Sequence, residues 1–502
     1  MYRSFLIAIF FISVIGCSKS SSKPDPKKAT DQPVKVPDTA AVISAKVVIK
    51  TNKQKVYVHY MPWFETPATS GNGKWGQHWA MANENPDVIQ SNGRRQIASY
   101  FYPMIGPYAS SDRDVIDYHL LLMKYAGIDG VIVDWYGVHN VNDYPLNKRN
   151  TDSLFNRIPN TGLQFGICYE DAQLAQVKAK AGIDTVTAAK EDFAYLQTAY
   201  FSSNSYIKIN DQPLLLCFGP QGMKTANDWQ QAFSGLNTKP RLLPLEYQGN
   251  VAGNSADGEF AWVESTGQAN LQGFYQNRTP SLATFFAGAY PGFKDFYKPG
   301  GWGNTLFVLD HNEAATLQAT LDLAKTSGTN YLQLITWNDY GEGTVVEPTT
   351  DYGYTDLGII QDFRRQYLAP DFAYKTNDLA LATRFYNLRR QYVSNPFASA
   401  ELDRIFTNIV SGNLASAEIQ LHGLELNLPV IYNLSLNAGL LGFSVGGFIV
   451  SNGADVQMSS NLTSPTWVTI NSFPASTNQM MFSMPLSQNA GPTFFKVRTT
   501  VP

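Results

Sequence analysis

The stretch SSDRDVIDYHLLLMKYAGIDGVIVDWYG, residues 110–137, changes its hydrophobic pattern half-way along. In the first half, Ile116, Leu120 and Met123 recur at the spacing of one helix face, and Ser111 stands where a helix N-cap is expected. In the second half, GVIVDWYG is apolar on both of its alternating faces, which is typical of a parallel strand covered by helices. The stretch therefore predicts a helix followed by a buried strand.

The same alternation of strand and helix extends over most of the chain. The nine candidate strands lie at 56–63, 97–105, 130–137, 163–171, 213–220, 241–247, 259–265, 283–290 and 331–339. Eight or nine such strands within a domain expected at 51–370 predict a (β/α)8 TIM barrel. A doubly wound open sheet is the alternative, but no GxGxxG or phosphate-binding loop follows any strand, so nothing indicates a nucleotide site.

The N-terminal residues have the pattern of a targeting segment. A positive charge precedes an apolar run at 5–15 that is too short to span a bilayer and ends in VIGC. This order resembles a bacterial lipobox, so residues 1–17 are expected to be a lipoprotein signal peptide with Cys17 as the lipidated residue. Residues 18–50 are rich in Ser, Lys, Pro and Asp and are expected to form a disordered tether. We expect a protein anchored in the bacterial cell envelope, at the surface or periplasmic face of the outer membrane, with no other membrane contact.

The pattern changes again beyond the predicted barrel. Residues 371–423 carry two helical patterns, the first marked by Leu381, Phe385 and Leu388. The remaining residues, 424–502, are rich in Ser, Asn and Gly and contain short alternating β-type pieces. A short helical segment and a small β-sandwich-like module are therefore expected. The composition leaves open whether this module binds sugar, packs against the barrel or acts as a spacer.

Composition and motif spacing exclude several kinds of partner. The net charge of −3, with no stripe of Lys and Arg, argues against nucleic acid. Cys168 and Cys217 lie inside predicted strands and are expected to be buried thiols rather than a disulfide framework. The six His residues show no HExxH or paired spacing, so the sequence predicts no zinc or other metal site and no cofactor. We expect a monomer.

Acids and aromatic residues gather at the carboxyl ends of the predicted strands, which is where a (β/α)8 barrel has its active site. The last strand runs into ITWNDYGEGTVVEP, residues 335–348, with Asp339, Glu342 and Glu347 in quick succession. A carboxyl pair can supply the acid and base of glycosidic cleavage, while aromatic faces stack on sugar rings. The pattern predicts a sugar site. A Ca²⁺ site is the alternative, although no DxDxDG spacing occurs.

Two long segments, YVHYMPWFETP…GKWGQHW (57–79) and YPMIGPYASSDRDVIDYHLLLMKYAGIDGVIVDWYG (102–137), resemble glycoside hydrolase family 99. The members of that family are endo-α-mannosidases on a (β/α)8 barrel. Their final motif, Asn-Glu-Trp-His-Glu-Gly-Thr followed by Glu-Pro, is similar to NDYGEGT and the later Glu-Pro here. The motif TWNDYGE (336–342) is also similar to family 71, the α-1,3-glucanases. The resemblance covers roughly residues 56–350.

The resemblance implies roles for the two acids of the last motif. By position, Glu342 resembles the general acid/base, and Asp339 resembles the glutamate that deprotonates the sugar 2-hydroxyl in family 99. Asp is one methylene shorter than Glu, and a misplacement of about 1 Å can cost on the order of a hundredfold in rate. Either the substrate sits deeper in this site, or water attacks directly, as the similarity to family 71 implies.

The other candidate site residues are expected to bind substrate. Trp63, His78 and Trp79 resemble the family's substrate-side motif, and Glu170 falls at a strand end where the family uses an acid. The rest belong to strand ends or to the last motif: Tyr60, Asp134, Trp135, Tyr136, Trp337, Asn338 and Glu347. Structural alternatives stay open, because a rim Trp can pack against a loop, Asp134 can bind backbone amides, and Glu347 can hold the loop from behind.

These observations predict a surface-anchored enzyme that cleaves internal α-glycosidic bonds in a polysaccharide or oligosaccharide. The long rim motifs favour an α-mannose-containing substrate, since specificity depends on loops around the site. The alternatives are an α-1,3-glucanase of the family 71 type and a non-catalytic surface lipoprotein that binds glycans. The presence of both acids, Asp339 and Glu342, favours an enzyme.

Overall fold

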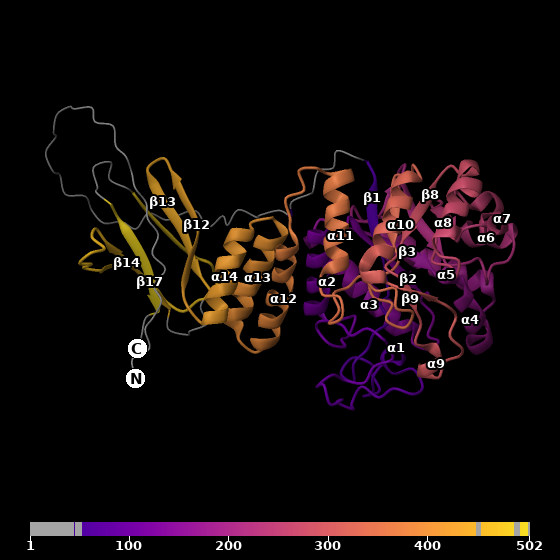
Figure 1. Ribbon diagram of the computed structural model, residues 1–502, viewed down its shortest axis with the longest axis horizontal. Coiled ribbons are helices and arrows are strands. Elements are labelled where there is room, and N and C mark those ends of the chain that lie inside the picture. Colours follow the sequence, from indigo (N-terminus) through magenta and orange to yellow (C-terminus); the bar gives the residue numbers. More distant parts are fainter. Residues whose placement is uncertain (1–44, 46–52, 448–452, 486–491, 500–502) are drawn as a thin grey trace. The chain divides into compact units, whose positions relative to one another are not determined.

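The structure, a computed structural model, describes residue 45 and residues 53–447, 453–485 and 492–499. In the described chain, contacts define two compact units with their boundary between Thr383 and Arg384, and Figure 1 shows the helices and strands of both. The predicted signal peptide, Cys17 and almost all of the predicted tether lie outside the described residues. None of the helices in the described ranges combines the length and the apolar character that crossing a bilayer requires.

The first unit is built on parallel strands that form a ring. These are β1 (Lys55–Tyr60), β2 (Gly130–Trp135), β3 (Gln164–Tyr169), β5 (Gln212–Cys217), β6 (Arg241–Pro244), β7 (Glu259–Phe260), β8 (Phe285–Ala289) and β11 (Tyr331–Leu334). A continuous ladder runs from β6 through β5, β3, β2, β1, β11 and β8 to β7. Two isolated parallel bridges, Leu242 with Ala256 and Leu245 with Phe260, join β6 to β7. The predicted (β/α)8 barrel is confirmed.

Helices connect successive strands and lie around them (Figure 1). They are α2 (Arg113–Ala126), α3 (Tyr144–Arg157), α4 (Leu174–Ala181), α5 (Thr185–Leu196), α6 (Ala226–Phe233), α7 (Gly249–Ala252), α8 (Gln268–Gly273), α10 (Ala315–Thr326) and α11 (Thr355–Phe363). Shorter elements belong to the loops: α1 (Gln77–Ala80), β4 (Lys208–Ile209), β9 (Phe293–Lys294), α9 (Tyr297–Gly300) and β10 (Val308–Leu309).

Helix α2 begins one residue later than its sequence pattern predicts. The N-cap is Asp112, not Ser111, and its carboxylate accepts a hydrogen bond of 2.9 Å from the amide of Asp114. An aspartate cap adds a favourable charge at the positive end of the helix, which a serine does not supply. The helix ends at Gly127, which adopts the left-handed conformation with a φ of 85°.

The predicted strand at 97–105 is wrong. These residues form a loop in the long connection between β1 and α2, and their backbone bonds to the loop after β11 instead of to the barrel. Pro103 forms an isolated bridge with Thr349, and the amide of Met104 donates to the carbonyl of Pro348 over 2.9 Å. Ile97, Ala98 and Pro103 are buried in this loop, whereas Tyr100 is 44% exposed. Eight of the nine candidate strands therefore form the barrel.

Alternation along the strands decides which side chains enter the barrel. Tyr57, Ile132 and Cys168 belong to the apolar cluster inside it, whereas the hydroxyl of Tyr60 reaches His119 on the covering helix α2. Because side chains alternate with a period of two, polar residues one position apart at a strand end go to opposite sides of the wall. This alternation separates rim residues from residues buried under the helices.

The second unit contains helices and two small antiparallel sheets. Helix α12 (Thr376–Gln391) crosses the boundary, and α13 (Pro396–Val410) and α14 (Leu414–Leu426) follow it. The sheets are β12-β13-β16 and β15-β14-β17, formed by β12 (Val430–Asn437), β13 (Leu440–Gly446), β14 (Ala454–Ser459), β15 (Val468–Phe473), β16 (Met480–Pro485) and β17 (Phe494–Thr499). Side chains of both sheets share one apolar core, which includes Phe443, Val456 and Phe495. The predicted boundaries at residues 370 and 423 stay predictions.

Candidate active site

Four carboxyl groups converge at the carboxyl ends of the barrel strands. Asp134 is the penultimate residue of β2, Glu170 follows β3, and Asp339 and Glu342 lie in the loop after β11. Burial raises the pKa of Asp134 well above its usual range; a hydrogen bond with Glu170 opposes this shift, and the charges of Asp339 and Glu342 add to it. The structure therefore brings together four acids that the sequence places on three separate strands.

The loop after β11 holds its two acids one turn apart. The amide of Asp339 donates to Oγ1 of Thr336 over 2.8 Å, and Oδ1 of Asp339 accepts from the amide of Glu342 over 3.0 Å. Gly343 ends the turn with a φ of 70°, and an added Cβ there would lie 2.7 Å from the carbonyl oxygen of Lys294. The position therefore requires glycine, both for its backbone conformation and for the close approach of the neighbouring loop.

The environment separates the proton affinities of the two acids. Burial raises the pKa of Asp339 to about 6, while the hydrogen bond from the Glu342 amide opposes this shift. Burial also raises the pKa of Glu342, and the charge of Asp339 adds to this effect, so the value reaches about 8. At neutral pH, Asp339 is therefore largely ionised and Glu342 largely protonated. Two carboxyls in these states can act as a base and an acid.

A tyrosine that the sequence analysis did not select completes the acid pair. The hydroxyl of Tyr297, on α9, donates to Oε1 of Glu342 over 2.8 Å. The backbone of this segment is tied to the same loop, because the amides of Lys294 and Phe296 donate to the carbonyls of Glu342 and Gly341. Residues 291–303, PGFKDFYKPGGWG, carry no strand pattern and sit far from the last motif, so no local signal identified Tyr297.

An aromatic row lies at the rim beside the acids. The rings of Trp63 and His78 stack at a centroid distance of 4.3 Å, and Tyr136 is 6.1 Å from Trp63. Trp302 meets His78 edge-on at 5.7 Å and is 42% exposed. The charge of His78 also acts on Asp339, which places the row close to the acid pair. We call these four residues the aromatic row; Trp302 belongs to the same unpatterned segment as Tyr297.

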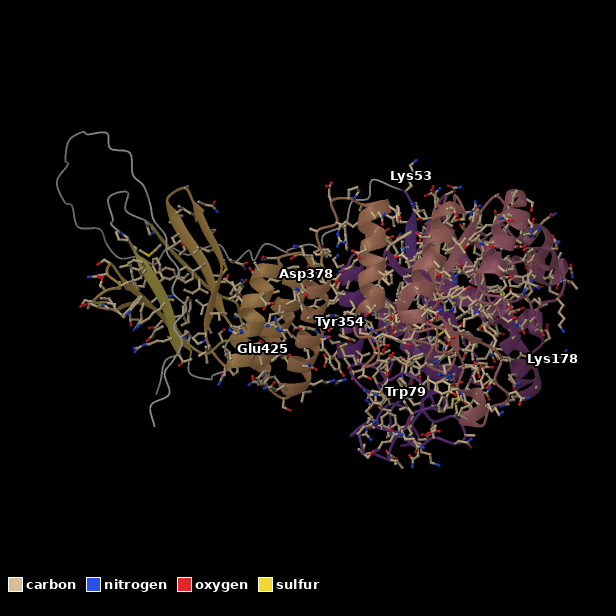
Figure 2. All side chains as sticks on the ribbon, viewed as in Figure 1. Lys53, Trp79, Lys178, Tyr354, Asp378 and Glu425 are labelled. Atoms are coloured by element: carbon tan, nitrogen blue, oxygen red, sulfur yellow. The ribbon has the colours of Figure 1, made fainter. Side chains whose placement is uncertain are left out.

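Three of the expected substrate-binding residues are tryptophans that pack inside the protein. Trp79, Trp135 and Trp337 are fully buried, and Figure 2 labels Trp79. The indole of Trp79 donates to the carbonyl of Tyr108 over 2.8 Å, Trp135 lies near Tyr195 of α5, and Trp337 lies near His119 of α2. In this structure these three side chains contact buried neighbours and contribute to the packing that supports the site.

Tyr60, Asn338 and Glu347 join a buried hydrogen-bond network below the acid pair. The Tyr60 hydroxyl lies 3.1 Å from Nδ1 of His119, and Nε2 of His119 lies 3.0 Å from Oε1 of Glu347. The Tyr108 hydroxyl donates to Glu347 over 2.7 Å and accepts from Nδ2 of Asn338 over 3.0 Å. Their predicted contacts with substrate stay predictions, while their contacts with one another hold the start of the acid-bearing loop.

One protein-family model matches most of this chain. The model of "Glycosyl hydrolase family 99" matches residues 51–371, which is more than half of the chain and includes every strand of the barrel. The chain belongs to glycosyl hydrolase family 99. The acid-bearing loop, the aromatic row and Tyr297 all lie inside the matched residues.

Individual relatives of this family 99 chain match it over shorter stretches. A mouse protein named glycoprotein endo-alpha-1,2-mannosidase-like protein is 27% identical over 160 residues, which is 30% of this chain and 33% of that protein. The glycoprotein endo-alpha-1,2-mannosidase of Xenopus laevis is 28% identical over 140 residues, which is 22% of this chain and 31% of that protein. The chain thus spans about a third of the length of these curated relatives.

A solved structure is similar in fold to this family 99 chain. The GH99 endo-alpha-mannosidase from Bacteroides thetaiotaomicron superimposes with a TM-score of 0.50 at 18% sequence identity. The match covers 62% of this chain and 98% of that one. The likeness supports the barrel architecture of the first unit.

Proposed function

We propose that this family 99 chain is a glycoside hydrolase that cleaves internal α-glycosidic bonds in α-mannose-containing glycans. The observation that carries the proposal is the pairing of Asp339 and Glu342 on one turn at the rim of the barrel, with pKa values raised to about 6 and about 8. Near neutral pH one group is ionised and the other protonated, which is the acid and base pair that glycosidic cleavage uses.

In this reaction Glu342 gives its proton to the glycosidic oxygen as the bond between that oxygen and the anomeric carbon breaks. Asp339 accepts a proton on the other side of the sugar. The proton comes from the sugar 2-hydroxyl if the route resembles family 99, or from an attacking water if it resembles family 71. The anomer of the first product, followed by NMR, separates the two routes, because direct water attack inverts the anomeric configuration.

The rim of the barrel supports a carbohydrate substrate. The aromatic row offers flat faces next to four carboxyl groups, and this combination suits sugar rings and their hydroxyls. The two relatives named as endo-alpha-1,2-mannosidases or similar to them, and the solved endo-alpha-mannosidase, favour α-mannose over other sugars.

The proposal is tested by the products released over time from an α-mannan and from an α-1,3-glucan. We expect mannose oligosaccharides to appear before free mannose. Monosaccharide as the first product would contradict internal cleavage. Release of glucan oligosaccharides with the mannan untouched would replace the proposed substrate by α-1,3-glucan, the second candidate, which the shorter acid at position 339 favours.

We also propose that the enzyme is anchored in the bacterial cell envelope through a lipid on Cys17. The basis is the sequence order of a short apolar run followed by VIGC. A Cys17→Ser variant is expected to leave the membrane fraction and to keep its activity in solution. Retention of this variant in the membrane fraction would contradict the anchor.

A further inference from the structure

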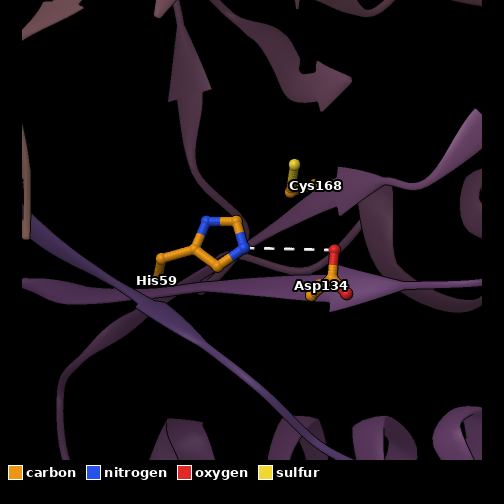
Figure 3. A group of neighbouring side chains, drawn as sticks. All are labelled: His59, Asp134 and Cys168. Carbon is orange, nitrogen blue, oxygen red and sulfur yellow. Dashed lines mark ion pairs between the residues drawn. The ribbon is translucent and has the colours of Figure 1, made fainter. Parts of the chain in front are cut away.

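Three side chains from neighbouring strands converge inside the barrel, and one of them, Asp134, also belongs to the four acids at the strand ends. One ligand atom of His59, one of Asp134 and Sγ of Cys168 all lie within 4.8 Å of one another, and Figure 3 shows the group. Nε2 of His59 is 4.0 Å from Oδ1 of Asp134. All three side chains are almost completely buried, with exposed fractions of 1%, 2% and 0% in that order.

The barrel wall holds this group rigidly. Asp134 on β2 and Cys168 on β3 are direct partners in the parallel register. His59 on β1 pairs with Ile132, two residues before Asp134 on the same face of β2. The three side chains therefore point inward from consecutive strands of the sheet, and a site carried by strands keeps its geometry better than one carried by loops.

The group contains a buried polar atom without a partner. Oδ1 of Asp134 has no hydrogen-bond partner among the described residues, although it is shielded from solvent. Leaving a buried carboxylate oxygen unpaired costs free energy, so an additional group at this position is favoured. This oxygen lies 4.0 Å from Nε2 of His59, and the dashed line in Figure 3 marks the pair.

We propose that His59, Asp134 and Cys168 bind a divalent cation that prefers nitrogen and sulfur ligands, with Zn²⁺ as the best fit. One imidazole, one carboxylate and one thiol are the ligand types of zinc, whereas Ca²⁺ and Mg²⁺ require a larger set of oxygen ligands. The ordinary bond lengths of zinc sites, about 2.0–2.3 Å, require the ligand atoms to close by roughly 1 Å.

The charges of the site balance. Cys168 loses its thiol proton and Asp134 any carboxyl proton to solvent as the metal binds, so one thiolate and one carboxylate neutralise the two charges of the cation. Three protein ligands leave a fourth coordination position. Glu170, which is hydrogen-bonded to Asp134, lies next to that group and is the nearest acid of the rim. The sequence could not reveal this site, because its ligands are 75 and 34 residues apart, far beyond any short metal motif.

The test uses the full chain, stripped with a chelator and titrated with Co²⁺, which reports thiolate ligation through a charge-transfer band in the near ultraviolet. The native protein and a Cys217→Ser control are expected to bind one Co²⁺ with this band. Cys217 is a matched control because it is also a buried thiol on a barrel strand, β5, but lies outside the group. In Cys168→Ser, the band should vanish and the affinity for Zn²⁺ should fall about 100-fold or more.

Equal binding by the native protein and Cys168→Ser, or a native protein without the band, would overturn the proposal and indicate adventitious metal only. Circular dichroism checks that each variant folds, and His59→Gln gives a second variant if Cys168→Ser does not. His59→Gln should keep the thiol but lose about as much affinity, and native affinity in this variant would also overturn the site. Metal binding is read without activity, so this result does not depend on the proposed function.

Discussion

The hydroxyl of Tyr297 donates a hydrogen bond of 2.8 Å to Oε1 of Glu342, and this contact joins two loops that are 45 residues apart in the chain. Tyr297 is on α9, in a segment whose backbone amides bond to the carbonyls of the acid-bearing loop. The Tyr297 side chain therefore holds the carboxyl of Glu342, while the backbone amides hold the main chain that carries it. We interpret Tyr297 as a positioning residue for the proposed acid.

Tyr297→Phe should lower kcat by about tenfold, the scale of one lost hydrogen bond, and leave KM nearly unchanged. This hydrogen bond lowers the pKa of Glu342, so its loss should raise that pKa and move the alkaline limb of the pH–rate profile to higher pH. Tyr100→Phe, which changes an exposed tyrosine near the neighbouring Phe296, is the control and should show neither effect. A normal pH profile in Tyr297→Phe would remove its positioning role.

Glu342→Gln should reduce turnover by about 10²- to 10⁴-fold, because an amide keeps the shape of the side chain but cannot transfer a proton. Glycan binding, measured by calorimetry, and the melting temperature should stay close to native. Asp339→Asn should lose activity in the same way. If Glu342→Gln unfolds the protein instead, the residue is structural.

The pH dependence of kcat/KM should form a bell. Activity requires Asp339 ionised and Glu342 protonated, so it should rise as the pH passes about 6 and fall as it passes about 8. The two groups interact, so the two limbs belong to the pair and not to single residues. Initial rates on a single α-mannan between pH 4 and 10 measure both limbs, and an optimum below pH 5 would contradict this assignment.

Glu347→Ala should destabilise the barrel by about 3 kcal/mol, because Tyr108 and His119 would lose the partner for their buried polar atoms. The midpoint of urea unfolding is the measurement. Glu191→Ala serves as the control, since the side chain of Glu191 is 53% exposed and its removal should change the midpoint little. Unchanged stability together with a raised KM would instead assign Glu347 to substrate binding.

Trp302→Ala should raise KM about fivefold and leave kcat almost unchanged, because a stacking face is lost while the acids stay in place. Trp302→Phe retains an aromatic ring and should recover most of the affinity. A native KM in Trp302→Ala would place the sugar away from the aromatic row.

Much of the barrel could be predicted from sequence because its strands are short apolar runs with strong turn signals. The apolar segment at 97–105 has the same composition but lies in a loop and is only partly buried, and composition alone does not separate these two environments. At β7 a strand was predicted correctly but too long: only two residues form it, although its predicted run is longer. Strand boundaries depend on pairing partners that a single sequence does not identify.

The sequence also predicted only part of the candidate site, because the register of the sheet and tertiary contacts decide the rest. Acids at strand ends were identified because a (β/α)8 barrel has its active site at the carboxyl ends of its strands. Asp134 and Trp135 are adjacent in sequence, yet one faces the interior and the other packs toward α5. Only the register of the sheet decides which of two neighbours enters the barrel. Tyr297 and Trp302 reach the site from a loop, and their position depends on tertiary contacts.

Backbone hydrogen bonding between neighbouring strands is not uniform around the barrel. The acids stand on β2, β3 and the loop after β11, within the continuous ladder of paired strands, whereas β6 and β7 are joined by two isolated bridges. Local opening is least costly where backbone pairing is sparse. The wall can therefore open locally at the β6–β7 seam at a lower cost than on the arc that carries the acids, so flexibility of the barrel and precise placement of the reacting groups belong to different arcs.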